Sequence, residues 1–140
     1  MKYQWNSDLE TGNEIIDKQH KELFAMLNNL IGVYQNGKNL AELDKAIEFL
    51  RAYVVKHFAD EEKLQEEYDY YDILNHKMYH RDFKNTVSDF VSRLEKEGYS
   101  DSLLEIIIQS VADWLVNHIK GDDFKMAAHI QSVKLLKQEE

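Results

Sequence analysis

The chain of 140 residues has the length of a single domain that can bury a core without disulfide or metal staples. Its formal net charge of −9 argues against nucleic acid or an anionic membrane as the main partner, because both require a basic surface. The absence of cysteine excludes disulfides, thiolate metal sites and cysteine nucleophiles, and the lack of a signal-peptide core or a membrane-spanning apolar run predicts a cytoplasmic protein.

Helix interrupters are rare in this sequence, since proline is absent and only five glycines occur. An arm of residues 1–17 precedes the first predicted helix, which covers residues 18–36. Its inward side chains recur at alternating steps of four and three residues, the spacing of one helix face. They are His20, Phe24, Leu27, Ile31 and Tyr34. Asn36 and Gly37 end this helix in the manner of a C-cap.

The second predicted helix covers residues 39–66, with Asn39 as its N-cap and Glu42 in a position like that of a capping box. Its inward stripe is Leu43, Ile47, Leu50, Val54, His57, Glu61 and Leu64. The third predicted helix covers residues 72–97, and Gly98 closes it. Its inward stripe is Ile73, His76, His80, Phe83, Val87, Phe90 and Leu94.

The fourth predicted helix covers residues 101–121 and is capped by Ser100 or Asp101. Its inward stripe is Leu104, Ile108, Val111, Leu115 and His118, with Trp114 beside it. Residues 122–140 form a charged tail that either prolongs this helix or makes a short appendage. Four amphipathic helices with short connections predict an all-α, up-down-up-down antiparallel four-helix bundle, with residues 1–140 as one domain.

Five of the six histidines occupy positions in these apolar stripes. An unsatisfied buried polar group costs about 1–3 kcal/mol, so each of these imidazoles needs a partner in the core. A single histidine on an apolar face is more often a hydrogen-bonded core residue than a metal ligand. In this topology, however, the starts of odd helices and the ends of even helices meet at one end of the bundle. The five histidines therefore converge on one layer, which favours a metal site.

Imidazole and carboxylate ligands without thiolate suit zinc, iron, copper or manganese. More ligands converge than one tetrahedral zinc ion can use, so a pair of ions is the natural number. The four-residue spacing from His57 to Glu61, and from His76 to His80, aims two ligands in the same direction from each helix. Ferritin-like di-iron bundles use Glu-x-x-His pairs, and this sequence contains none.

At these residues the chain resembles the hemerythrin family, and within it the single-domain bacteriohemerythrins. Four segments carry the resemblance, they occur in the family's order, and they cover all four predicted helices. They are residues 16–24 (IDKQHKELF), 57–62 (HFADEE), 76–80 (HKMYH) and 114–123 (WLVNHIKGDD).

The resemblance implies a non-haem di-iron centre, with an oxo or hydroxo bridge, that binds molecular oxygen. Carried over residue by residue, one iron would be held by His76, His80 and His118. The other would be held by His20 and His57, and it would be the iron that takes oxygen. Glu61 and Asp123 would bridge the two ions.

The bridging aspartate conflicts with ideal helix geometry. Asp122 lies four residues after His118 and would share its face, whereas Asp123 lies five residues after it and would be rotated away. The family pattern has five residues, so we expect Gly121 or a local widening of the helix to bring Asp123 round. A tyrosine that family members often carry three residues after this aspartate is replaced here by Met126, which affects only the surroundings of the ligands.

The resemblance places Leu115 and Ile119 on the oxygen side of the centre, with Trp114 beside them as the third residue of an oxygen pocket. Such a pocket would keep water and protons away from bound oxygen. Plain core packing explains the same three side chains, and both roles are compatible.

Two functions use the same ligands. The first is reversible oxygen binding by a carrier, store or scavenger that is not an enzyme and has no catalytic residues. The alternative is a di-iron oxidoreductase that reduces oxygen, peroxide or nitric oxide with electrons from a reductase partner. A sensor is a third hypothesis, but sensing members of the family usually carry an output domain. The resemblance to single-domain members also implies a monomer.

Overall fold

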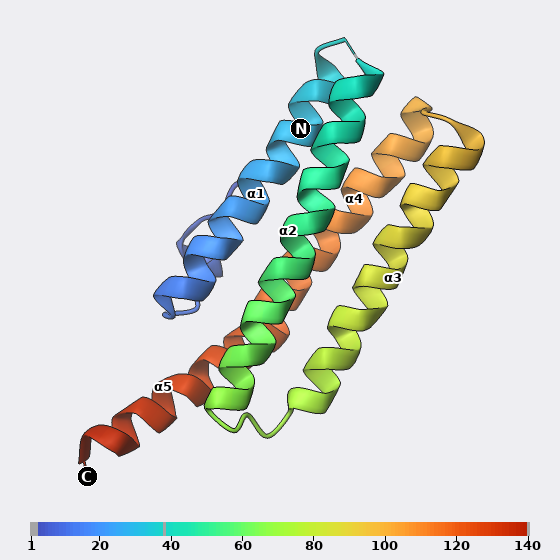
Figure 1. Ribbon diagram of the computed structural model, residues 1–140. Helices are drawn as coiled ribbons and strands as arrows, with labels where there is room; N and C mark the ends of the chain where they lie inside the picture. Colours follow the sequence, from blue (N-terminus) through green and yellow to red (C-terminus); the bar gives the residue numbers. More distant parts are fainter. Residues whose placement is uncertain (1–2, 38, 140) are drawn as a thin grey trace.

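The computed structural model describes residues 3–37 and 39–139, so residues 1–2 of the predicted arm and residue 140 of the predicted tail lie outside the described part. Within it, four long helices alternate in direction and form a bundle (Figure 1). They are α1 (Glu14–Gln35), α2 (Leu40–Glu67), α3 (Ile73–Glu97) and α4 (Asp101–His118). The predicted all-α fold and antiparallel four-helix bundle are confirmed.

The first helix begins four residues before its predicted start at residue 18. The Asn13 side chain caps it, because its Oδ1 accepts a hydrogen bond from the backbone N–H of Ile16 at 3.1 Å. Asp17 lies in the first turn and accepts hydrogen bonds from the backbone N–H and the hydroxyl of Thr11 at 2.8 and 2.7 Å. These contacts fix the point at which the arm becomes helix.

The second and fourth helices begin at the N-caps that their sequences indicate. Asn39 Oδ1 accepts a hydrogen bond from the backbone N–H of Glu42 at 3.1 Å. Ser100 Oγ accepts one from Leu103 at 3.2 Å, which identifies Ser100 as the N-cap of α4. Between them, Gly98 ends α3 with a φ of 81°, a left-handed conformation that favours glycine.

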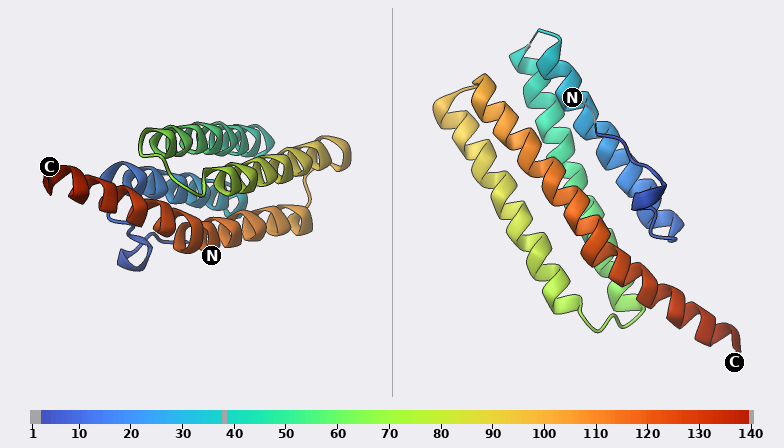
Figure 2. Two further views of the ribbon diagram at one scale, coloured as in Figure 1. Left: turned by 90° about the horizontal axis from the view of Figure 1, so that it is seen from below. Right: turned by 180° about the vertical axis from the view of Figure 1, so that it is seen from behind.

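The predicted tail is a continuation of the fourth helix. A π-helical turn (Ile119–Asp123) follows α4 and leads into α5 (Phe124–Glu139), which extends beyond the bundle (Figures 1 and 2). Ring and polar contacts attach α5 to the α2–α3 connection. Lys125 Nζ lies 3.0 Å from Asp72 Oδ2, and His129 Nε2 lies 2.8 Å from the backbone oxygen of Tyr68.

The N-terminal arm runs back along the bundle (Figure 2). The backbone N–H of Tyr3 donates to Asn28 Oδ1 on α1 at 2.9 Å, and the Tyr3 hydroxyl donates to Gln109 on α4 at 3.1 Å. A short 3₁₀ turn, η1 (Ser7–Leu9), buries Leu9 in a small cluster with Phe24 and Ile119. The arm thus covers the side of the bundle between α1 and α4.

The bundle core has two parts. At the end that carries the α1–α2 and α3–α4 connections, apolar side chains fill the space between the helices, and we call this part the apolar half. Its fully buried members include Leu27, Leu30, Leu43, Leu104 and Ile108. The other part contains buried ionisable side chains. None of the described helices is apolar over a length sufficient to cross a membrane.

Candidate metal centre

Seven ionisable side chains are buried together near the end of the bundle where α1 begins and α2 ends. Each residue is at most 5% exposed. We call them the histidine layer: His20 from α1, His57 and Glu61 from α2, His76 and His80 from α3, His118 from α4, and Asp123 from the π-helical turn. All seven side chains that the sequence suggested as metal ligands therefore lie in one place.

Three histidines converge through their Nε2 atoms. The Nε2 atoms of His76 and His80 lie 3.0 and 3.1 Å from that of His118. Asp123 Oδ1 lies 3.1 Å from His76 Nε2 and 3.3 Å from His118 Nε2. Glu61 Oε1 lies 3.3 Å from His80 Nε2. These five residues each offer one ligand atom within 4.8 Å of the others.

The two remaining histidines form a second group with the same carboxylates. His20 Nε2 lies 2.9 Å from Asp123 Oδ2, and His57 Nε2 lies 3.2 Å from Glu61 Oε1. These four residues also offer ligand atoms within 4.8 Å of one another. The two oxygens of Asp123 thus face different groups, Oδ1 toward the three histidines and Oδ2 toward His20. Both carboxylates lie between the two groups, which is the position of a bridging ligand.

The π-helical turn explains why Asp123 enters the layer. In a π-helix the hydrogen bonds join residues five apart, so Asp123 returns to the face of His118. Asp123 is fully buried, whereas the side chain of Asp122 remains 34% exposed. The local widening expected from the sequence is present at Ile119–Asp123. A Cβ at Gly121 would meet no atom within 4 Å, so this glycine does not create the turn by allowing a close approach.

The layer fits metal ions better than it fits hydrogen bonding. Eight of the ten buried side-chain atoms without a hydrogen-bond partner in the described part of the chain belong to these seven residues. Native interiors leave few such atoms unpaired. Two ligand atoms that bind one ion at about 2.1 Å and at right angles lie about 3.0 Å apart. The separations of 2.9 to 3.3 Å therefore match shared coordination.

Burial dominates the pKa values of the layer. It lowers the pKa of His57 to about 4 and, with the neighbouring histidines, that of His80 to about 2. Burial and the nearby Asp123 raise the pKa of Glu61 well above its ordinary value. Burial disfavours charge on Asp123 and His118 as well, but their mutual attraction prevails. It holds the pKa of Asp123 well below its ordinary value and raises that of His118 to about 10.

Two side chains outside the layer bind the far ring nitrogens of its histidines. His57 Nδ1 donates to Gln19 Oε1 at 2.7 Å, and Gln19 Nε2 in turn donates to Asp60 at 2.8 Å. His118 Nδ1 donates to Asp122 Oδ2 at 2.9 Å. A proton fixed on Nδ1 directs Nε2 toward the centre, where its lone pair binds a metal once any proton on Nε2 is displaced.

The sequence predicts no role for Gln19 or Asp122. The four-residue spacing from His118 to Asp122 is a usable signal for a contact between them, although in the sequence Asp122 competes with Asp123 as the bridging ligand. Gln19 could not be found in this way, because it reaches His57 from another helix.

The three predicted pocket residues all lie against the layer or the core beside it. The Trp114 ring stacks on His118 with centroids 4.3 Å apart and on Phe83 with centroids 3.9 Å apart. Leu115 is 2% exposed and Ile119 is fully buried. Together they place an aromatic and aliphatic wall beside the α4 end of the layer.

Met126, which stands where the family often has tyrosine, lies fully buried below the layer. It belongs to a small apolar cluster with Ile16, Tyr70 and Ile130. The Gln65 amide nitrogen donates to its sulfur at 2.8 Å. Met126 thus keeps a polar contact although it lacks a hydroxyl.

Comparisons with known proteins agree with this geometry. The family model described as the hemerythrin HHE cation binding domain matches residues 11–130. The bacteriohemerythrin of Pseudomonas aeruginosa (strain UCBPP-PA14) is 37% identical over 131 residues, which cover 93% of this chain and 80% of that protein. The myohemerythrin of Theromyzon tessulatum is 34% identical over 123 residues, which cover 88% of this chain and 89% of that protein.

Solved structures show the same likeness in three dimensions. A crystal structure of wild-type hemerythrin superposes with a TM-score of 0.82 and 29% sequence identity. The superposition covers 91% of this chain and 97% of that chain. The likeness therefore includes the whole bundle.

Proposed function

The chain belongs to the hemerythrin family and binds molecular oxygen at a non-haem di-iron centre, and we propose that the histidine layer provides all protein ligands of that centre. One iron is assigned to His76, His80 and His118, the other to His20 and His57, with Glu61 and Asp123 bridging both. The observation that carries this assignment is the pair of ligand groups, which share only these two carboxylates. When bound, the two ferrous ions would supply the two electrons that reduce oxygen on uptake and would receive them back on release.

The two ligand groups differ in size, which supports a place for oxygen. One contains five residues and the other only four. A metal with fewer protein ligands keeps an open position for an exogenous ligand. The metal held by His20 and His57 would therefore be the one with room for oxygen. Ile119, which packs against Phe24 on α1, and the neighbouring Leu115 and Trp114 would limit the access of water.

The protein's own contribution is orientation and exclusion of water. The bonds from His57 to Gln19 and from His118 to Asp122 fix both rings with Nε2 directed at the centre. The low pKa values of His57 and His80 keep these imidazoles neutral, the form that binds metal. The two buried carboxylates of Glu61 and Asp123 offset part of the positive charge of the iron ions. Without them, burying these ions in an apolar core would cost a large desolvation free energy.

Reversible binding, as in a carrier, store or scavenger, requires no electron donor, and the proposal includes no reductase partner. We further propose a monomer in the cytoplasm, which is consistent with a chain that lacks cysteine. An oxidoreductase would differ by consuming electrons in every cycle.

An optical titration tests the proposal. The protein is loaded with ferrous iron without air, exposed to oxygen and then returned to inert gas without a reductant. We expect a visible absorption band that appears with oxygen and disappears under inert gas over several cycles. A direct change to a stable ferric spectrum, with release of reduced oxygen species, would favour the oxidoreductase instead.

Leu115→Ala tests the wall. We expect the variant to bind two irons but to autoxidise several-fold faster than the wild type, because the smaller side chain admits water to the oxygen side. Leu104→Ala is the matched control, since it removes an equally buried leucine from the same helix in the apolar half. Equal autoxidation rates in the two variants would remove Leu115 from the pocket.

A further inference from the structure

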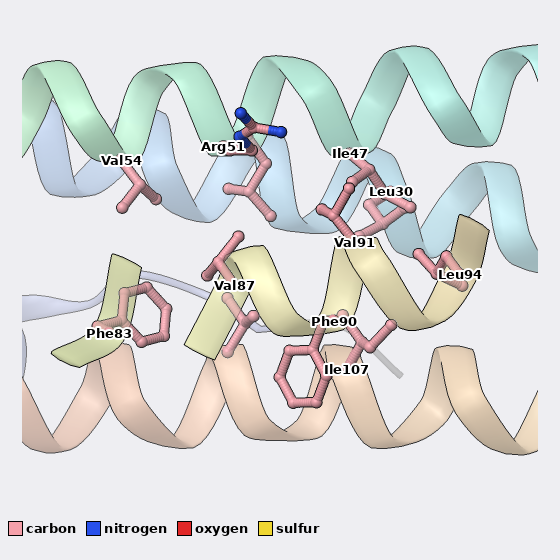
Figure 3. A pocket seen from close by; sticks show the side chains of 12 residues that line it. Leu30, Ile47, Arg51, Val54, Phe83, Val87, Phe90, Val91, Leu94 and Ile107 are labelled. Carbon is pink, nitrogen blue, oxygen red and sulfur yellow. The ribbon is translucent and has the colours of Figure 1, made fainter. Parts of the chain in front are cut away.

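A cavity of about 30 Å³ lies in the apolar half, between α2, α3 and α4 (Figure 3). Apolar side chains from these helices and from α1 line it, and Arg51 is the only lining residue with a polar side chain. The Arg51 side chain is 44% exposed, and its Nη1 lies 3.6 Å from Glu48 Oε2 on the surface. The polar group therefore belongs to the rim, and the interior of the cavity is apolar.

The size and chemistry of this cavity fit a small apolar gas. A water-sized sphere needs about 10–15 Å³, so a cavity of about 30 Å³ has room for a molecule of two heavy atoms such as dioxygen. A buried water needs about two to four polar partners, and apolar cavities without them stay dry. Dioxygen needs no such partners, since it makes only dispersion contacts with its surroundings.

The cavity begins one helical turn from the histidine layer on two helices. Val54 lines it three residues before His57 on α2, and Phe83 lines it three residues after His80 on α3. Three residues of α-helix correspond to a rise of about 4.5 Å. Phe83 also stacks on Trp114, so one side of this ring borders the cavity and the other borders the wall of the metal centre.

The opposite side of the cavity approaches solvent between α2 and α3. Ile47, Val87, Phe90 and Val91 line it and are only partly buried. The histidine layer, in contrast, is at most 5% exposed, so oxygen must cross protein to reach it. The cavity thus lies between a partly exposed part of the bundle and the neighbourhood of the metal centre.

We propose that this cavity binds dioxygen without a metal bond, as a holding site through which the gas enters and leaves the di-iron centre. The inference rests on the proposed oxygen-binding function for its physiological ligand. Blocking a route of this kind lowers the rates of oxygen uptake and release by the same factor, because it raises the barrier without changing the free energy of the oxygen-free or the oxygen-bound protein. The equilibrium affinity is then unaffected.

Xenon tests the gas site independently of oxygen binding. Crystals of the iron-loaded wild type are pressurised with xenon, and anomalous scattering locates the bound atoms. We expect xenon in the cavity of the wild type and none there in Ile107→Phe, whose larger ring fills the space. Ile106→Phe is the matched control, because Ile106 is the next residue along the same helix but its side chain is 50% exposed.

Stopped-flow oxygen binding tests the route. Ile107→Phe should lower both the association and the dissociation rate constants at least threefold with their ratio unchanged, and Ile106→Phe should lower neither. Val87→Leu adds a single methylene at a partly buried position, and it should slow both steps in the same direction if Ile107→Phe does not fold.

The outcomes separate the two proposals. Absence of xenon from the wild-type cavity, or an ordered water in its place, would overturn the gas site. Xenon in the cavity with unchanged oxygen kinetics in the filled variants would overturn the route. A wild-type protein that takes up no oxygen would refute the proposed function itself. The xenon experiment would still report separately whether the cavity holds a gas.

Discussion

The apolar half and the histidine layer are built from the same four helices, with inward side chains at the same alternating steps of three and four residues. In the apolar half these side chains interlock with one another and leave a small cavity lined mainly by apolar groups. In the histidine layer they leave eight buried polar atoms without a hydrogen-bond partner. One pattern of spacing therefore produces two kinds of core.

The difference lies in what completes each core. Aliphatic side chains gain free energy simply by leaving water, so the apolar half is complete with the chain alone. Buried imidazoles and carboxylates lose their hydration. This cost is offset only by a partner that accepts their lone pairs, here metal ions. The stability of the two halves should therefore respond differently to metal and to substitution.

The largest effect should follow from His76→Ala, which removes a ligand from the five-residue group and leaves a gap in the layer. We expect iron content to fall from two ions per chain to one or fewer. Loss of a tightly bound ligand can cost about 4 kcal/mol, which corresponds to a fall in melting temperature of roughly 10 °C or more. Iron assay and calorimetry measure both.

Leu74→Ala provides the control for this variant, because Leu74 lies on the same helix but is 80% exposed. It should retain both irons and the wild-type melting temperature. Removing iron from the wild type with a chelator should reproduce most of the destabilisation. Two irons per chain in His76→Ala would contradict the assignment of His76 as a ligand.

Leu104→Ala should have the next largest effect, and it should act on stability alone. A buried leucine truncated to alanine costs about 2–5 kcal/mol. We expect this loss in chemical denaturation of iron-loaded protein, with two irons still bound. Ile106→Ala, at an exposed position two residues away, should change little. A loss of iron in Leu104→Ala would show that the two halves are not independent.

Asp122→Asn should have an intermediate effect, confined to the histidine layer. The amide keeps the shape of the side chain but weakens the bond that orients His118. Substitution of such outer partners typically lowers metal affinity about 10- to 100-fold. Competition with a chelator measures this change, and Asp113→Asn, an exposed carboxylate on the same helix, should leave the affinity unaltered. Equal metal affinities in the two variants would show that Asp122 does not help to orient the ligands of the centre.

Asn39→Ala should have the smallest effect. Its side chain caps α2 at the end of the bundle away from the histidine layer. Loss of an N-cap costs about 1 kcal/mol, so we expect a fall of roughly 3 °C in melting temperature with iron content and oxygen binding unchanged. A change in oxygen binding would indicate that the two ends are coupled.

Much of the site was accessible from the sequence because its ligands follow helical spacing. His57 and Glu61, or His76 and His80, share a helix face by arithmetic alone, and antiparallel topology then places the pairs at one end. Asp123 was accessible only through the family pattern, since ideal helix geometry favours Asp122. The predicted start of α1 is four residues too late, because its N-cap, Asn13, lies well before His20, the first residue of the inward stripe.

Local sequence determined the helices and the helix faces that carry the five histidines and Glu61, because these depend on spacing and residue chemistry within one segment. Only the tertiary structure decided how Asp123 enters the layer, that Gln19 orients His57 across two helices, and where the apolar half leaves a cavity. Each of these depends on how side chains from different helices meet in space. These contacts between helices are fixed by side-chain packing, which no single segment of the sequence specifies.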